Sequence, residues 1–365
     1  MTEFPPQDTA HMRRALDLAA QGRFSTSPNP RVGCVIARGG QIVGQGFHLQ
    51  AGTPHAEVHA LRQAGELARG ATAYVTLEPC AHYGRTPPCA EALIAAGVGR
   101  VVAAMRDPNP QVAGKGFAML EAAGIATASG LLADEARELN RGFLSRIERG
   151  RPFVRIKTAA SLDGKTALSD GRSQWITDSA ARADVQILRA ESCAVLTGIG
   201  TVLADDPQLN VRDFPTLRQP LRIVLDSRLR LSPAHRIASD GGATLVITHT
   251  EDDGRFAAHP AVRVRTLPAG ASPHIDLPAL LALLAAEEQI GELIVEAGAT
   301  LAGEFLRQDL ADEIVHYQAP KMLGSGTREL FRLPENPAAL TGAGSWHTRS
   351  VEVLGSGIKW VLRRP

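Results

Sequence analysis

The sequence has few cysteines, no excess of either charge and no long apolar run, and each shortage excludes a class of protein. Only 4 of the 365 residues are Cys, which excludes a small disulfide-stabilised scaffold. The 39 Lys and Arg residues nearly balance 38 Asp and Glu, so a net charge of +1 offers no basic face for nucleic acid. No run of about 18 apolar residues occurs, and the first residues lack a signal-peptide pattern. We therefore expect a cytoplasmic protein that binds neither nucleic acid nor membrane.

Length and composition indicate an ordinary globular protein of about two domains. Hydrophobic residues make up 44% of the chain and charged residues 21%. Strand-like and helix-like segments alternate through both halves, which predicts an α/β architecture with parallel strands. The charged joint E-R-G-R-P follows a predicted helix over 131–149. We place a domain boundary there, between 1–150 and 151–365.

The periodicity and turn residues predict the order of the elements in each half. In the first half the helices are expected at 9–20 (capped by Asp8 or Thr9), 55–64, 89–97, 115–123 and 131–149, and the strands at 32–37, 41–46, 72–77, 101–105 and 125–128. In the second half the strands are expected at 153–161, 193–198, 221–227, 243–248 and 292–296, the helices at 180–190, 278–288 and 304–308, a loop at 199–207, and antiparallel edge strands at 313–320, 321–327, 351–354 and 358–362.

The spacing of His55, Glu57, Cys80 and Cys89 is the strongest functional signal in the chain. In zinc-dependent deaminases of nucleobase-like rings, one His and two Cys hold the metal, and a Glu two residues after the His transfers protons. Three protein ligands leave the fourth tetrahedral position of zinc for water, which the metal makes nucleophilic near neutral pH. Glu57 would take the proton from that water and give it to the departing amine.

The surroundings of this motif refine the prediction and leave one alternative open. We expect Cys80 and Cys89 at the starts of helices, where peptide dipoles favour the thiolate. His82 is the candidate for a fourth ligand, which would make the site structural instead of catalytic. The segment between the two cysteines, which contains His82 and Arg85, is long enough to form part of a substrate pocket. Cys34 and Cys193 are expected to be thiols on buried strands.

The second half carries weaker signals. A glycine-containing turn over 298–303 between a strand and a helix could cradle a phosphate, or it could be a plain tight turn. Trp175 could stack on a cofactor ring, or simply pack. Several charged residues are expected at the surface unless they converge in one cleft, namely Lys157, Asp163, Arg189, Asp205, Arg212 and Glu296.

Nine motifs along the whole chain resemble those of the bifunctional deaminase/reductase family of riboflavin biosynthesis. They read N-P-R-V-G-C-V-I, H-A-E-V-H-A-L, A-Y-V-T-L-E-P-C, H-Y-G-R-T-P-P-C, D-P-N-P-Q-V-A-G-K-G, K-T-A-A-S-L-D-G-K-T-A, S-Q-W-I-T, T-V-L-A-D-D-P-Q-L and V-E-A-G-A-T-L-A-G. The resemblance implies an α/β fold class, with an N-terminal cytidine-deaminase-like three-layer domain and a C-terminal dihydrofolate-reductase-like domain. It also implies zinc and NADPH as cofactors, phosphoribosylaminopyrimidine substrates, and a homo-oligomer.

Residue roles follow from the same resemblance, position by position. In the first domain it implies that His55, Cys80 and Cys89 are zinc ligands, that Glu57 is the proton carrier, and that Asn29, His48, His82, Arg85 and Asn109 contact the substrate. In the second domain it implies an NADPH site lined by Ala159, Trp175, Thr201, Asp205, Ser227, Gly298, Ala299, Thr300, Leu301, Ala302, Gly303 and Glu304. The substrate of the reductase would be contacted by Ser173, Arg189, Leu209, Arg212 and Glu296, with Lys157 as a further polar contact.

Two other functions compete with the interpretation as a bifunctional deaminase/reductase. A nucleic-acid deaminase with an accessory domain would need a basic groove, which the balanced charge does not supply. Alternatively, the second half could be a binding or assembly module without catalytic activity, which an assay of NADPH oxidation would reveal.

Overall fold

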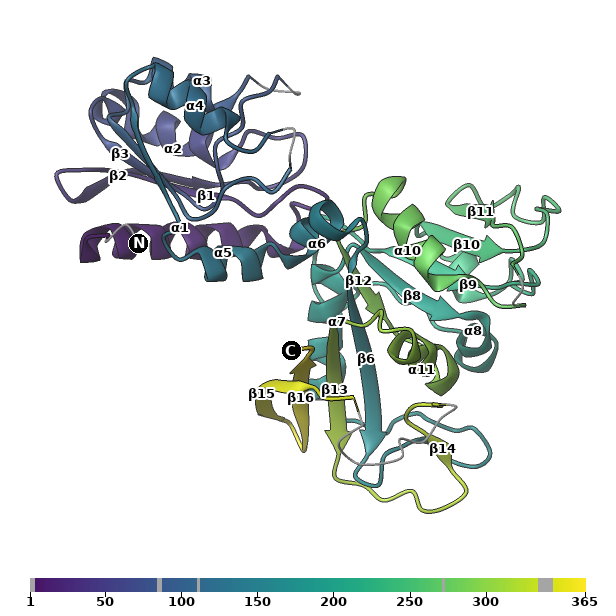
Figure 1. The fold of residues 1–365 in the computed structure, drawn as a ribbon. Coiled ribbons are helices and arrows are strands. Elements are labelled where there is room, and N and C mark those ends of the chain that lie inside the picture. The colour runs from purple at the N-terminus through teal and green to yellow at the C-terminus, as the bar shows by residue number, and fades with distance from the viewer. Residues whose placement is uncertain (1–3, 84–86, 110–111, 271–272, 334–343) are drawn as a thin grey trace. The chain divides into compact units, whose positions relative to one another are not determined.

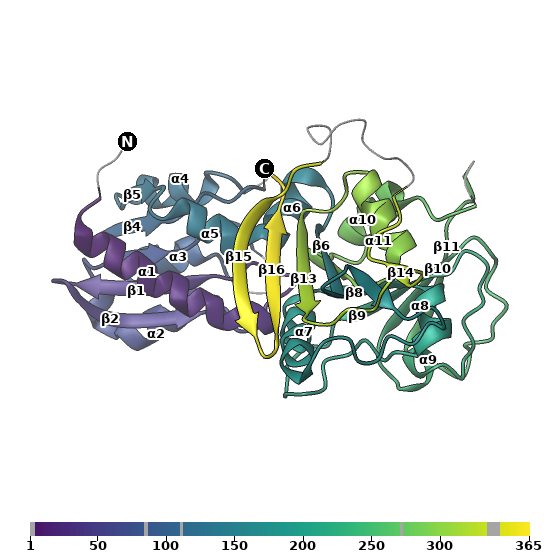
Figure 2. The ribbon, with the colours of Figure 1, turned by 90° about the horizontal axis from the view of Figure 1, so that it is seen from below.

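The computed structural model describes residues 4–83, 87–109, 112–270, 273–333 and 344–365. The chain divides into two compact units, Met1–Gly150 and Arg151–Pro365. Figures 1 and 2 show the helices and strands of each unit in two orientations. Within the described residues, no helix is both long enough and apolar enough to cross a membrane.

The described part of the first unit is built on a five-stranded sheet in the order β2-β1-β3-β4-β5. Its strands are β1 (Gly33–Arg38), β2 (Gln41–Phe47), β3 (Thr72–Val75), β4 (Arg100–Ala103) and β5 (Ala126–Ser129). Strand β1 is antiparallel to β2 and β3, whereas β3, β4 and β5 run parallel. The helices are α1 (Pro6–Ala20), α2 (Ala56–Ala64), α3 (Cys89–Ala95), α4 (Lys115–Ala122), α5 (Ala133–Leu139) and α6 (Arg141–Arg149).

Alternation along the strands gives this sheet two apolar faces. On β1, Cys34 and Ile36 join a cluster with residues of α2, α3 and α4, while Val35 and Ala37 join a cluster with residues of α1 and α5. Figure 1 shows α1 and α5 on one side of the sheet and α2, α3 and α4 on the other. The unit therefore has three layers, helix, sheet and helix, as expected.

Two glycines let helix α2 lie directly on the sheet. A Cβ at Gly44 would come within 2.2 Å of the Ala60 carbonyl oxygen, and one at Gly46 within 2.5 Å of the His59 Cβ. Any larger residue at these positions of β2 would push the helix away. This close approach fixes the start of α2, where His55 and Glu57 lie.

The described part of the second unit contains a nine-stranded sheet in the order β11-β10-β9-β8-β12-β6-β13-β16-β15. Its strands are β6 (Phe153–Ser161), β8 (Ala194–Gly198), β9 (Leu221–Leu225), β10 (Thr244–Thr248), β11 (Val262–Thr266), β12 (Glu292–Val295), β13 (Glu313–Ala319), β15 (His347–Leu354) and β16 (Gly357–Arg363). The strands from β11 to β13 are parallel, and β16 and β15 extend the sheet in antiparallel order. A short pair, β7 (Lys165–Ala167) and β14 (Arg328–Glu329), stands apart.

Helices cover both faces of this sheet. Helices α10 (Leu277–Ala286) and α11 (Ala299–Arg307) supply apolar residues to one core cluster, and α7 (Ser179–Glu191), α8 (Ile199–Asp205) and α9 (Arg236–Ser239) supply the other. Ala194 and Leu196 of β8 face the first cluster and Val195 faces the second. Both faces are apolar, which is why the parallel strands read as continuous hydrophobic runs.

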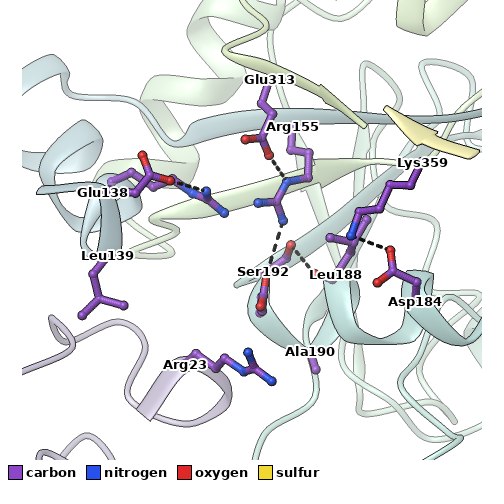
Figure 3. A network of polar contacts seen from close by, with 12 residues as sticks. Arg23, Glu138, Leu139, Arg155, Asp184, Leu188, Ala190, Ser192, Glu313 and Lys359 are labelled. Atoms are coloured by element: carbon purple, nitrogen blue, oxygen red, sulfur yellow. Dashed lines mark hydrogen bonds and ion pairs between the residues drawn. The ribbon is translucent and has the colours of Figure 1, made fainter. Parts of the chain in front are cut away.

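A buried ion pair fixes the register of three neighbouring strands in this unit. Glu313 of β13 stands opposite Arg155 of β6 and Arg363 of β16, and its carboxylate accepts from the Nε atoms of both. Figure 3 shows the Arg155 guanidinium pointing at Glu313. A one-residue slip of β13 would separate the charges, so the pairing specifies how the antiparallel extension joins the parallel strands.

The structure corrects the predicted helix over 131–149, which is two helices, α5 and α6, separated at Asn140. Asn140 leaves the helical conformation with φ −108° and ψ 18°. Its Oδ1 accepts from the Arg31 backbone N–H at 2.8 Å, and its Nδ2 donates to the Arg31 carbonyl at 3.0 Å. A side chain bonded to the backbone in this way competes with helix continuation, so tertiary contact overrides the helical periodicity.

Several other predicted elements were wrong. The expected loop at 199–207 contains helix α8, and helix α11 begins at Ala299 instead of Glu304. Strand β13 lies inside the sheet and is parallel to β6, so it is not an antiparallel edge strand. Residues 321–327 form no strand. Strands β7, β11 and β14 and helix α9 were not predicted; β7, β14 and α9 are two to four residues long, and β11 alternates apolar and charged residues at the edge of the sheet.

In the first unit, helix α1 begins at Pro6, so Asp8 is not its cap. Asp8 is buried and accepts a hydrogen bond from the Tyr74 hydroxyl.

Replacing Asn140 with Ala should destabilise the region around Arg31. The change removes both hydrogen bonds between the Asn140 side chain and the Arg31 backbone, a loss of about 1–3 kcal/mol. Hydrogen–deuterium exchange of the peptide that contains Arg31 should become at least several-fold faster. Gln50→Ala, at an exposed turn, serves as the control, and equal exchange in the two variants would contradict the role given to Asn140.

Candidate active sites

The first candidate site gathers residues from three segments at one end of the first sheet. His55 immediately precedes helix α2, Glu57 is the second residue of that helix, and Cys89 is the first residue of α3. Cys80 lies in the irregular segment after β3, not at a helix start as predicted. Its sulfur nevertheless accepts from the Cys89 backbone N–H at 3.3 Å, so it still faces the start of α3. All four cysteines of the chain are free thiols.

The three predicted ligands converge with a geometry that fits zinc. One ligand atom each from His55, Cys80 and Cys89 lies within 4.8 Å of the others. The His55 Nδ1 atom is 3.3 Å from the Cys89 sulfur and 3.7 Å from the Cys80 sulfur. A tetrahedral zinc with ordinary bond lengths would hold nitrogen and sulfur ligands about 3.6 Å apart. Among the described residues no fourth ligand joins the group, and His82, the expected rival, is exposed.

The electrostatics of the two thiols favour metal binding. Hydrogen bonds from the Cys89 thiol and from His55 lower the pKa of Cys80 to about 4, although burial opposes the shift. The pKa of Cys89 is raised because its thiol donates to Cys80 and is buried. The hydrogen bonds at Cys80 therefore favour its thiolate, which is the form that binds a metal. A dication at this position would compensate both thiolates.

Glu57 has the environment of a proton carrier near neutral pH. Its side chain is 3% exposed, and its Oε2 atom has no hydrogen-bond partner among the described residues. Burial, helped by the nearby Cys80, raises the pKa of Glu57 to about 7. A carboxyl group with such a pKa can both accept and return a proton under cellular conditions.

Two of the predicted substrate contacts lie beside the ligands. Asn29 Nδ2 is 3.0 Å from His48 Nε2, and the His48 ring lies 5.2 Å from the His55 ring. His48 Nδ1 is 3.2 Å from the Pro54 carbonyl, to which it donates. This contact leaves His48 Nε2 as the acceptor for Asn29 and fixes both side chains next to the metal site.

The remaining predicted contacts of this site lie in two segments. Asn109 follows strand β4 and is partly buried, close to Asp107, whose side chain accepts from the Asn109 backbone N–H at 2.9 Å. Burial raises the pKa of Asp107, with Glu78 adding to the shift and the nearby His82 opposing it. Arg85 lies outside the described residues.

The second candidate site is a cluster of charges in the second unit. Arg189 of α7 donates to Glu296 from Nε at 2.6 Å and from Nη2 at 3.0 Å. Lys157 of β6 lies 3.8 Å from the same carboxylate. Burial alone would raise the pKa of Glu296, but Arg189, Lys157 and Arg212 together lower it to about 2. Of the charged residues that the sequence left open, Lys157, Arg189 and Arg212 act on Glu296, whereas Asp163 and Asp205 do not belong to this cluster.

The residues expected to hold NADPH lie on different elements of the second unit. Ala159 is on β6, Thr201 and Asp205 are on α8, and Ser227 follows β9. Trp175 is 60% exposed, with the Arg182 guanidinium 4.7 Å above its ring. Two residues expected at the reductase substrate site lie on other segments of this unit: Leu209 is buried with φ +54°, and Ser173 lies between β7 and α7.

The segment 298–304 has the features of a phosphate cradle. It is not a glycine turn followed by a helix, as predicted, because Gly298 caps α11 and the residues from Ala299 to Glu304 are already helical. No heavy atom lies within 4 Å of the place where a Cβ on Gly298 would point. The start of a helix carries backbone N–H groups without partners inside the helix, which is the feature that suits a diphosphate group.

Two carboxylates bind backbone groups, and sequence reasoning missed this role for Glu78 and expected Asp163 at the surface. Glu78 is 3% exposed and accepts from four backbone N–H groups. Asp163 accepts from the backbone N–H groups of Leu323 and Gly324. The signal for Glu78 was its place directly after a buried strand, where a charged residue needs partners.

The fold and the sites define a two-unit enzyme, with a zinc deaminase unit followed by an α/β unit of the reductase type. The cytidine and deoxycytidylate deaminase zinc-binding region matches residues 5–105, and the RibD C-terminal domain matches residues 152–360. The riboflavin biosynthesis protein RibD of Escherichia coli (strain K12) is 55% identical over 340 residues, 90% of this chain and 92% of that protein.

Solved structures agree over nearly the whole chain. The structure of Acinetobacter baumannii RibD, form 1, has a TM-score of 0.92 and 46% identity, covering 98% of this chain and 99% of that one. A diaminohydroxyphosphoribosylaminopyrimidine deaminase/5-amino-6-(5-phosphoribosylamino)uracil reductase from Thermotoga maritima has a TM-score of 0.87 and 34% identity, with coverage of 98% and 99%.

The chain belongs to the RibD family of riboflavin biosynthesis proteins. It is a bifunctional enzyme with a cytidine-deaminase-like domain that uses zinc and a dihydrofolate-reductase-like domain that uses NADPH. The expected family, fold class and cofactors are thereby confirmed.

The ligand geometry predicts one zinc ion per chain. Cys89→Ser should lose most of its zinc during dialysis against a chelator, because a neutral hydroxyl replaces a thiolate ligand. Cys34→Ala, which changes a buried thiol outside the ligand set, should keep the metal. Elemental analysis of the dialysed proteins measures the difference, and full zinc content in Cys89→Ser would contradict the ligand assignment.

The pKa of Glu296 predicts how the stability of the second unit depends on pH. Its folded-state pKa of about 2 lies below the ordinary 4.5, so the contribution of this carboxylate to the free energy of unfolding is complete above about pH 5 and is lost as the pH falls toward 2. All three Trp residues (Trp175, Trp346 and Trp360) belong to this unit, so Trp fluorescence during urea unfolding follows it. Glu296→Gln should weaken the pH dependence below pH 5, whereas the exposed Glu251→Gln should not. Equal curves for both variants would show that Glu296 is not held ionised.

Proposed function

We propose that the enzyme deaminates 2,5-diamino-6-(5-phosphoribosylamino)pyrimidin-4-one and then reduces the ribosyl group of 5-amino-6-(5-phosphoribosylamino)uracil to ribityl. The observation that carries the proposal is the convergence of His55, Cys80 and Cys89 beside the buried Glu57. The printed name of the Thermotoga maritima protein, which is similar over nearly the whole chain, supplies the substrates. We assign deamination to residues 1–150 and reduction to residues 151–365.

In the deaminase site the protein's own groups bind the ring and move protons. His55, Cys80 and Cys89 would hold zinc, which would supply the Lewis acidity that makes water nucleophilic at neutral pH. Glu57 accepts a proton from the attacking water and delivers a proton to the departing amine, so that ammonia leaves instead of an amide ion. Asn29, His48, His82, Arg85 and Asn109 are assigned to substrate binding, and a guanidinium at position 85 suits the substrate phosphate.

In the reductase site the protein orients substrate and cofactor. NADPH bound there would supply the hydride for reduction of the ribosyl group, and a proton from a neighbouring acid or water would complete the reduction. Ala159, Trp175, Thr201, Asp205, Ser227 and the segment 298–304 are assigned to the cofactor. Ser173, Arg189, Leu209, Arg212, Glu296 and Lys157 are assigned to the substrate.

The charges around Glu296 support the assignment of substrate binding there. Arg189, Lys157 and Arg212 act on Glu296, and Asp213 acts on Arg189, so three cations and two acids leave an excess of positive charge that suits a phosphorylated substrate. Because Glu296 neutralises part of that charge and binds Arg189 with two hydrogen bonds, the guanidinium has a fixed direction.

The proposal extends to where and in what form the enzyme works. We place it in the cytoplasm as a homo-oligomer, acting on small phosphorylated pyrimidines. The net charge of +1 and the scattered arginines suit such substrates and give no basic face for nucleic acid.

Changing Glu57 to Gln should separate the two activities. The amide cannot accept the proton, so ammonia release from the diaminopyrimidinone phosphate should fall by about 10²–10⁴-fold. Zinc content should be unchanged, and NADPH oxidation with the deaminated intermediate should continue at the wild-type rate.

The two assays also separate the competing interpretations. Deamination at a normal rate in Glu57→Gln would show that another group carries the proton. A wild-type protein that fails to oxidise NADPH with the deaminated intermediate would support the view of the second unit as a non-catalytic module. Tight, salt-sensitive binding of single-stranded DNA would favour a nucleic-acid deaminase instead.

A further inference from the structure

Glu78 is a buried carboxylate that lies between strand β3 and the zinc ligand Cys80. Glu78 is 3% exposed, and its carboxylate accepts hydrogen bonds from backbone N–H groups. Its Oε2 atom accepts from the backbone N–H groups of Asp107 at 3.2 Å and Gly114 at 3.1 Å. Its Oε1 atom accepts from those of Gly116 at 3.1 Å and Phe117 at 3.4 Å. Such a set of donors stabilises a buried carboxylate.

These donors come from the segment after β4 and from the start of helix α4. Asp107 belongs to the former, Gly114 caps the helix, and Gly116 and Phe117 lie in its first turn. The helix approaches so closely that a Cβ on Gly116 would lie 2.0 Å from the Pro79 carbonyl oxygen. The Glu78 backbone N–H also donates to the Met105 carbonyl at 3.0 Å. Glu78 therefore joins the segment that carries Cys80 to the segment that carries Asp107 and Asn109.

The joined segments both belong to the deaminase site. Cys80 follows Glu78 by two residues, and Asp107 lies close enough to Cys80 and His82 for their charges to act on it. Asn109, assigned above to the substrate, is held in turn by the Asp107 side chain. A shift of this segment relative to Cys80 would move Asn109 relative to the metal, and displacements of about 1 Å are enough to impair a catalytic site.

We propose that Glu78 is a positioning residue of the deaminase, which holds the 107–109 segment at the distance from Cys80 that the substrate requires. The inference rests on the function proposed above and adds a residue that does not itself touch the substrate. Its effect should appear in substrate affinity, because the zinc ligands His55 and Cys89 are held by other elements, α2 and α3.

The test compares Glu78→Gln with Glu66→Gln, an exposed residue of the same unit, in the full-length zinc enzyme. Gln has the same shape, but its NH₂ group meets N–H donors, so about half of the hydrogen bonds are lost. We expect the KM for deamination to rise at least tenfold and to change more than kcat. Zinc content should stay at the wild-type level, and reductase activity should stay within twofold, which verifies the amount of folded protein.

The results distinguish this inference from the proposed function. If the wild-type enzyme releases no ammonia from the diaminopyrimidinone phosphate, the proposed function fails. If it does, and Glu78→Gln has a KM within twofold of the Glu66→Gln value, the positioning role is wrong. A loss of activity that matches a loss of zinc, with KM unchanged, would also overturn it and leave Glu78 as a folding residue.

A second variant keeps the test decisive if Glu78→Gln does not fold. Gly116→Ala leaves the carboxylate intact but adds a methyl group against the Pro79 carbonyl, which must move α4 away from Glu78. The KM for deamination should again rise more than kcat changes, with zinc retained. An unchanged KM in this variant would contradict the proposal independently.

Discussion

The convergence of one imidazole and two thiols is the constraint on which the first unit depends. The three groups come from the residue before α2, the segment after β3 and the start of α3. They meet because α2 lies directly on β2 at Gly44 and Gly46 and because the Cys89 backbone N–H reaches the Cys80 sulfur. The glycines of β2 and the start of α3 thus fix the backbone at the site, and the backbone in turn fixes the ligand side chains. The zinc site is consequently a product of backbone packing.

Each unit contains a buried glutamate, and the neighbours of the two glutamates shift their pKa values in opposite directions. In the first, burial raises the pKa of Glu57 to about 7, which suits a group that exchanges protons. In the second, three cations lower the pKa of Glu296 to about 2, which suits a group that stays charged and orients Arg189. Two buried glutamates with opposite pKa shifts therefore serve opposite purposes. The difference lies in their neighbours, because the first has thiols nearby and the second has guanidinium and ammonium groups.

The sequence predicted most of what depends on local pattern. The order of strands and helices in the first unit, the buried strand that carries Cys34, and the grouping of His55, Cys80 and Cys89 followed from periodicity and ligand chemistry. The break at Asn140, the start of α11 at Ala299 and the interior position of β13 did not follow, because each is decided by contacts between distant residues. The same holds for Glu78, whose partners lie 29 to 39 positions along the chain.

The most direct test of the account is X-ray absorption spectroscopy of the zinc-loaded enzyme, because it counts the atoms bound to the metal. We predict two sulfur atoms at about 2.3 Å and one imidazole nitrogen and one water oxygen at about 2.0–2.1 Å. A shell filled by four protein ligands, for example with a second imidazole in place of the oxygen, would contradict a catalytic zinc site held by His55, Cys80 and Cys89.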